Sequence, residues 1–115
     1  MLNKVSLIGN LGKDIEIKGE VGKLSVATSE SWKDKASGER KERTEWHRVT
    51  VFGDNFVKAI QKLATKGRLV YIEGKLRTSS YEKDNVTHYS TEIVVDMEGM
   101  FRVLDKVDAA KDNAA

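Results

Sequence analysis

Two tryptophans stand beside the most densely charged stretch of this chain. Trp32 is followed closely by Lys33 and Lys35, and Trp46 is separated by one residue from Arg48. A flat aromatic ring can stack on an unpaired nucleic-acid base, while a mobile cation beside it contacts the neighbouring phosphate. These residue types at this spacing favour a binding protein for unpaired bases over an enzyme.

Each aromatic residue also has an ordinary structural interpretation. Tryptophans are often buried, and a mixed charge run such as 33–43 is usually a solvated loop. Trp32 borders that charged run and Trp46 lies between two polar residues, so the sequence favours contact with a ligand for both. On pattern alone Phe52 is balanced between core and contact, and Tyr81 lies in a polar segment that favours contact.

The sequence contains no recognisable arrangement of reactive residues. Cysteine is absent, which excludes disulfides and cysteine metal sites, and His47 and His88 are too few for a histidine-rich metal site. No Ser/His/Asp set or paired carboxylates can be identified, and the glycine spacing matches neither phosphate-binding loop. The chain is therefore predicted to have no enzymatic activity and to need no metal or cofactor.

Composition places the chain among small single-domain proteins. Its 115 residues are 39% hydrophobic and 33% charged, with a formal net charge of only +2. So mild a charge does not by itself predict nucleic-acid binding, because the cations must be clustered to create a useful field. The N-terminus does not resemble a signal peptide and no apolar run could span a bilayer, so we expect a cytoplasmic protein.

Alternation of apolar and polar residues predicts mostly strands, and one segment has helical spacing instead. The predicted strands are 4–8, 23–31, 43–52, 68–76, 89–97 and, shorter, 100–104. Residues 9–12 are predicted to form a turn or bulge, and 15–17 an extended segment. The helix is predicted at 54–66, with Asp54 as its N-cap and Gly67 as its stop.

Three strands, one helix and then two strands are the element order of an OB-fold. This fold is a five-stranded Greek-key barrel with a helix between its third and fourth strands. The long loops would be 33–42 and 78–88. Residues 1–104 would form this domain, and 105–115 a short flexible tail.

Six short strings follow one another in a recognisable order. They are NKV at 3–5, LIGNLG at 7–12, ATSESW at 27–32, RTEWHRV at 43–49, YIEGKLRT at 71–78 and TEIVV at 91–95. Together they resemble the single-stranded-DNA-binding proteins of bacteria, with phage and plasmid members, from Asn3 to about Leu104.

The resemblance implies roles for individual residues. It implies base stacking by Trp32, Trp46, Phe52 and Tyr81, where a tyrosine replaces the tryptophan common at the fourth position. The implied phosphate contacts are Lys4, Lys35, Arg48, Lys66 and Arg77, and the charge run adds Lys33, Arg40, Lys41 and Arg43. His47 matches a position at the subunit interface of a homotetramer, around which family members wrap single strands.

Relatives of this kind usually end in a flexible linker with an acidic tip that recruits repair and replication enzymes. The last residues here, 111–115, form no such tip, so this recruitment is expected to be absent. Asp54 and 79–80 replace residues that are often basic, which lowers the expected phosphate affinity, and the turn at 16–23 is shorter than usual. The implied function is protection of single-stranded DNA during replication, recombination and repair.

Two other functions use the same architecture. A primosomal or RNA-binding OB-fold module would share the stacking chemistry but prefer another partner. A structural or inhibitory OB-fold domain would bind proteins, and its tryptophan fluorescence would not respond to oligonucleotides.

Overall fold

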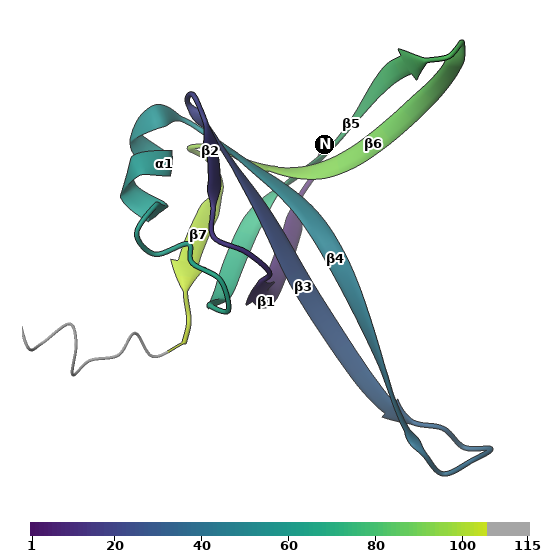
Figure 1. Ribbon diagram of the computed structural model, residues 1–115. Helices are drawn as coiled ribbons and strands as arrows, with labels where there is room; N and C mark the ends of the chain where they lie inside the picture. The colour runs from purple at the N-terminus through teal and green to yellow at the C-terminus, as the bar shows by residue number, and fades with distance from the viewer. Residues whose placement is uncertain (106–115) are drawn as a thin grey trace, which may run out of the picture.

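The computed structural model describes residues 1–105, and all but one of their regular elements are strands (Figure 1). The strands are β1 (Val5–Leu11), β2 (Glu16–Lys18), β3 (Val21–Lys33), β4 (Arg40–Phe52), β5 (Leu69–Lys83), β6 (Val86–Val95) and β7 (Met100–Val103), and the helix is α1 (Asp54–Ile60). The single helix among the described residues is too short and too polar to cross a membrane.

Five of the strands close into a barrel. The sheet runs β1-β3-β4-β6-β5, and pairing of β1 with β5 joins its two ends. All of these pairs are antiparallel except β4 with β6. Closure leaves β2 and β7 as short additions on β3 and β5. The predicted all-β barrel with one helix is confirmed.

The position of the helix in the chain corrects the prediction. Counted over all seven described strands it lies between the fourth and fifth, β4 and β5, and not between the third and fourth; counted over the five barrel strands it follows the third. The difference arises from β2, which was predicted only as an extended segment. Its three residues pair with the start of β3 across a turn at Gly19, whose φ of 62° suits glycine.

The helix is also shorter than its apolar spacing predicts. After Ile60 the chain continues as turns, although Ala64 stays buried with the helix residues. The N-cap is Gly53 and not Asp54, and no side chain caps this end. Asp54 lies one position later and pairs with Lys58 Nζ at 3.1 Å instead.

Two segments predicted as a turn and a loop, 9–12 and 78–88, are largely strand. β5 and β6 extend through most of 78–88 and leave a turn at 84–85, whereas 33–42 keeps the predicted hairpin loop over 34–39, between β3 and β4. The loop prediction at 78–88 was wrong because this part of β5 and β6 is exposed on both sides and lacks a buried face to create alternation. At 9–12, β1 continues to Leu11, because Gly9 has no Cβ to collide with the carbonyl oxygen of Ala27.

The outer parts of two hairpins form long arms that leave the barrel on the side away from α1 and β7 (Figure 1). One arm is the outer part of the β3–β4 hairpin and the other is that of β5–β6. The core lies within the barrel, under alternate residues of each strand and one side of the helix. It contains Leu11, Leu24, Val26, Val49, Val51, Val57, Ile60, Ala64, Val70, Ile72, Ile93 and Val95.

Candidate nucleic-acid interface

The outside of β4 carries the aromatic and cationic residues predicted from its alternation. Val49 and Val51 point into the core, so Trp46, Arg48 and Phe52 lie on the opposite side of the strand. The buried valines fix this orientation, because a slip of one residue would place arginine and tryptophan in the barrel.

Strands β6 and β5 extend the same surface. Arg48 Nη1 donates to Ser90 Oγ at 3.3 Å, and the guanidinium of Arg77 lies 5.1 Å from the centre of the Phe52 ring. Farther along β5, Tyr81 is on the same side as Arg77, four residues away. We call this surface the outer face and define it by Trp46, Arg48, Phe52, Arg77 and Tyr81.

Trp46 is the most exposed of the outer-face aromatics on β4. Its surface is 61% exposed, and its ring lies against Gly12, just after β1. A Cβ at position 12 would collide with Cζ3 of the ring, so any other residue there would displace the indole from this position. The main chain thus supports one part of the indole and leaves the rest open to a ligand.

Tyr81 has a partner at the end of the β5–β6 arm. Its ring stacks on that of His88, with centroids 5.1 Å apart and planes 18° from parallel. The two residues are directly opposite in the strand pairing. Tyr81 remains 55% exposed, so the pair offers a second aromatic surface. The sequence did not identify His88 as a site residue, because cross-strand pairing is not visible in one strand alone.

A half-buried carboxylate joins two residues at the centre of the outer face. Glu92 on β6 accepts from Thr50 Oγ1 at 2.5 Å and from Arg77 Nη2 at 2.8 Å. Lys23 Nζ lies 3.8 Å from the same carboxylate. Burial alone would raise the pKa of Glu92, but the hydrogen bonds and the nearby cations outweigh it and hold the pKa below its usual value.

Two cations that the sequence did not single out join this surface. Lys13 and Lys23 line a groove together with Arg48, Ser90 and Glu92. Lys23 comes just before the core residue Leu24 on β3, so its side chain points out of the barrel. The pairing of Ser25 with Arg48 shows that this side of β3 adjoins the outer face. Lys13 follows β1 and is brought there by the fold alone.

Trp32 is not part of the outer face. In the β3–β4 pairing it lies opposite Lys41, and this pair is on the other side of the hairpin from Trp46. Its surface is 45% exposed. The two tryptophans are therefore both accessible, but they present opposite sides of one arm.

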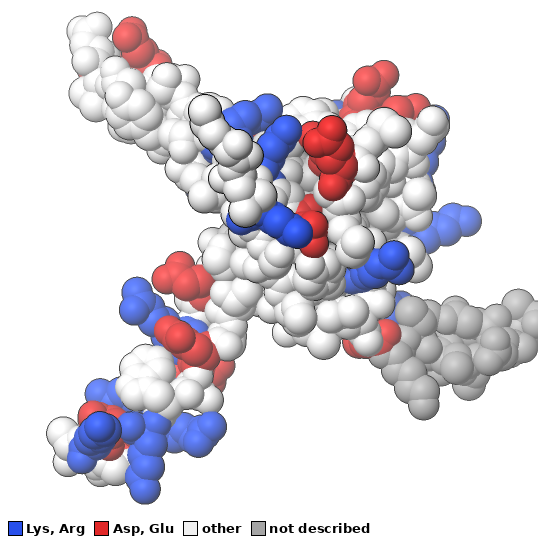
Figure 2. Space-filling model, turned by 180° about the vertical axis from the view of Figure 1, so that it is seen from behind, with Lys and Arg blue, Asp and Glu red and all other residues white. Residues whose placement is uncertain are grey.

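The predicted cations between residues 33 and 43 gather at the end of the β3–β4 arm (Figure 2). Asp34 organises the turn by accepting hydrogen bonds from the Ser37 hydroxyl and the Ala36 amide, which lower the pKa of its carboxyl. Acidic residues interrupt the cationic cluster. Its basic members are Lys33, Lys35, Arg40, Lys41 and Arg43.

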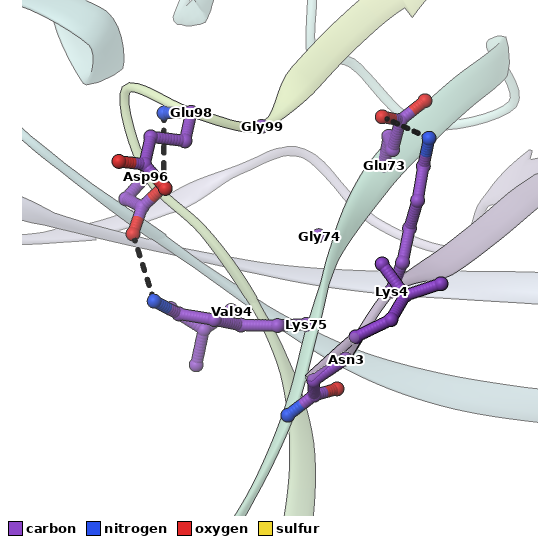
Figure 3. A pocket seen from close by; sticks show the side chains of 10 residues that line it. Asn3, Lys4, Glu73, Gly74, Lys75, Val94, Asp96, Glu98 and Gly99 are labelled. Carbon is purple, nitrogen blue, oxygen red and sulfur yellow. Dashed lines mark hydrogen bonds and ion pairs between the residues drawn. The ribbon is translucent and has the colours of Figure 1, made fainter.

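Lys4 lies apart from the outer face, in a charged cleft at the start of β1 (Figure 3). Its Nζ is 3.0 Å from Glu73, which raises the pKa of Lys4, and Lys75 pairs with Asp96 at 3.3 Å. Glu98 also lines the cleft, so carboxylates outnumber ammonium groups there. This environment does not favour a phosphate.

Two further predicted residues lie in different surroundings. Lys66 follows the helix, and its backbone amide donates to Asp14 at 2.7 Å, near the segment that supports Trp46. His47 is half-buried on the core side of β4 and forms a 2.8 Å hydrogen bond with Thr28 Oγ1. Within residues 1–105, no three carboxylate or histidine side chains come together as a metal site.

Comparison with known proteins agrees with this geometry. The model of the Single-strand binding protein family matches residues 2–101. A Plasmodium falciparum SSB, solved in complex with ssDNA, is 38% identical with a TM-score of 0.80; the match covers 91% of this chain and 96% of that one.

A more distant structure shares the fold. It is a deletion mutant of the single-stranded DNA binding protein from Thermus aquaticus, 24% identical with a TM-score of 0.73. The match covers 92% of this chain but only 52% of that one. With the family match over nearly the whole described barrel, the fold is an OB-fold and the chain belongs to the single-strand binding protein family.

Proposed function

We propose that this chain binds single-stranded DNA by stacking bases on its outer face and pairing phosphates with the cations there. The observation that carries the proposal is the alternation of exposed Trp46 and Arg48 on one strand, continued by Tyr81 on the next arm. Family membership and the DNA complex of the Plasmodium falciparum relative support the choice of ligand. The chain acts as a binder and not as an enzyme.

The two kinds of contact make different contributions. Stacking supplies about 1–3 kcal/mol per base with little sequence preference, because every base has a π-face. Phosphate contacts act through counterion release, so affinity falls as salt rises. Arg48, two residues along β4 from Trp46, lines the groove and is suited to the phosphates of DNA stacked on that ring. Lys13 and Lys23 line the same groove but pair with Glu16 and Glu92, which reduces what they can gain from a phosphate.

The second tryptophan implies a path for the strand. Trp32 lies on the other side of the β3–β4 arm, opposite Lys41 of the cationic cluster at the end of that arm. Single-stranded DNA that contacts both Trp46 and Trp32 must pass over an edge of this arm. The arm would then be wrapped by DNA and not merely touched on one side.

We also propose that the functional unit is a homotetramer. Support comes from β1, which pairs with β5 over Val5–Asn10 but with β3 only at Asn10 and Leu11. Along residues 5–9 one edge of the strand thus has no partner among the described residues, and such an edge can pair with a second copy. Sedimentation equilibrium tests this assembly, and a monomer at micromolar concentration would contradict it.

The biological role follows from the binding mode. Coating unpaired DNA protects it and prevents hairpins during replication, recombination and repair, and this role places the protein in the cytoplasm with the chromosome. The predicted lack of tail-mediated recruitment concerns residues outside those described. It remains a proposal.

Competition binding separates this function from its alternatives. A labelled oligothymidylate is bound first and then challenged with unlabelled single-stranded DNA, RNA of equal length or duplex DNA. Single-stranded DNA should compete best. Preference for RNA would favour an RNA-binding module, and no binding of any oligonucleotide would favour a protein-interaction domain.

A further inference from the structure

Four residues form a continuous chain of contacts at the centre of the outer face. Thr50 is buried and donates to one oxygen of Glu92, whose other oxygen accepts from Arg77. The guanidinium of Arg77 in turn lies over Phe52. Glu92 is only 16% exposed, so it is held firmly between the barrel wall and the arginine.

This arrangement affects access to Phe52. Its ring is half-buried, and Arg77 lies over it while remaining 50% exposed itself. A base that approaches on this side meets the guanidinium before it meets the phenylalanine. The arginine is also already paired with a carboxylate, which reduces what it can gain from a phosphate.

We propose that Arg77 is a base-stacking platform, with Phe52 supporting it from beneath and Glu92 as the positioning residue that fixes its plane. The inference rests on the proposed function and deepens it. It changes the role of Arg77, for which the family resemblance implied a phosphate contact, and it adds Glu92 to the binding surface.

The chemistry distinguishes the two roles of an arginine. A guanidinium is flat and weakly hydrated, so it stacks on bases as well as pairing with anions, whereas an ammonium is a compact, strongly hydrated charge. Replacing arginine with lysine therefore keeps a phosphate contact but removes a stacking platform.

The test measures binding of oligothymidylate and of an abasic oligomer of equal length over a range of salt concentrations. Extrapolation of affinity to 1 M salt isolates the contribution that does not depend on counterions, and the slope reports phosphate contacts. For Arg77→Lys we expect about ten-fold weaker oligothymidylate binding at 1 M salt, an unchanged slope and no loss on the abasic oligomer. Arg102→Lys on β7, outside the outer face, is the matched control and should behave as the unaltered protein.

Glu92 is tested through its dependence on Arg77. Glu92→Ala should lose base-dependent affinity to about the same extent as Arg77→Lys, and the double variant should lose little more, because both changes remove the same platform. Additive losses would overturn the positioning role. Glu92→Gln, which keeps an oxygen acceptor, should recover part of the loss, whereas a generally unfolded variant would lose binding to both oligomers.

The outcomes separate this inference from the function on which it rests. Oligothymidylate binding by Arg77→Lys equal to that of the unaltered protein, or a loss shared by the abasic oligomer, would overturn the platform. Failure of the unaltered protein to bind oligothymidylate at all would overturn the proposed function itself.

Discussion

Replacing Trp46 with alanine should weaken DNA binding by about as much free energy as it takes from the stability of the fold, so the two effects must be measured separately. The residue is 61% exposed, so about four-tenths of its surface is covered. For a tryptophan of roughly 200 Å², this is about 80 Å², which at about 25 cal/mol per Å² contributes about 2 kcal/mol to the free energy of unfolding. The stacking lost on DNA is about 1–3 kcal/mol, or about 5- to 150-fold in affinity.

Two assays on the same variant separate these effects. Urea denaturation gives the free energy of unfolding, and fluorescence anisotropy of a labelled oligothymidylate gives the affinity. Trp46→Phe is the matched control, because it keeps a smaller ring above Gly12 and should lose less affinity than alanine does. Unchanged affinity in folded Trp46→Ala would remove this residue from the binding site.

Three further predictions concern charged residues. Lys35→Ala should lower the slope of log affinity against log salt by about 1, because one phosphate contact is lost. Lys4→Ala should leave that slope unchanged in the same titration, because Glu73 already neutralises Lys4 away from the outer face. The folded pKa of Glu92 lies below its ordinary value of about 4.3, so its contribution to stability is complete above that pH and is lost as pH falls through the folded pKa. Urea denaturation from pH 6 to pH 3 should therefore show a shallower loss of stability in Glu92→Gln than in the unaltered protein. A slope unaltered by Lys35→Ala, a slope lowered by Lys4→Ala, or parallel pH curves would each contradict the corresponding prediction.

The sequence predicted the barrel well where one side of a strand is buried. Val49 and Val51 alternate with Trp46 and Arg48, and this alternation alone predicts both the strand and its exposed side. The β5–β6 arm was predicted as a loop because neither of its sides is buried, so hydrogen bonding between strands decides its structure. β2 was missed as a strand for a similar reason, since all three of its residues are exposed.

The site was predictable by residue type but not by arrangement. Nothing in the sequence placed Trp32 and Trp46 on opposite sides of one hairpin, because this depends on the pairing of Trp32 with Lys41 across a turn. The sequence did not identify Glu92 as a site residue for another reason. A lone glutamate in a strand has no distinctive pattern, and only the fold brings it against Thr50 and Arg77.

Base stacking on the tryptophans can be observed by titrating their intrinsic fluorescence with a long oligothymidylate, at low and at high salt. We expect deep quenching that saturates, with an affinity that falls as salt rises, because bases stack on Trp46 and Trp32 while cations contact the phosphates. Folded protein whose fluorescence is unchanged by oligothymidylate at low salt would contradict this mode of binding.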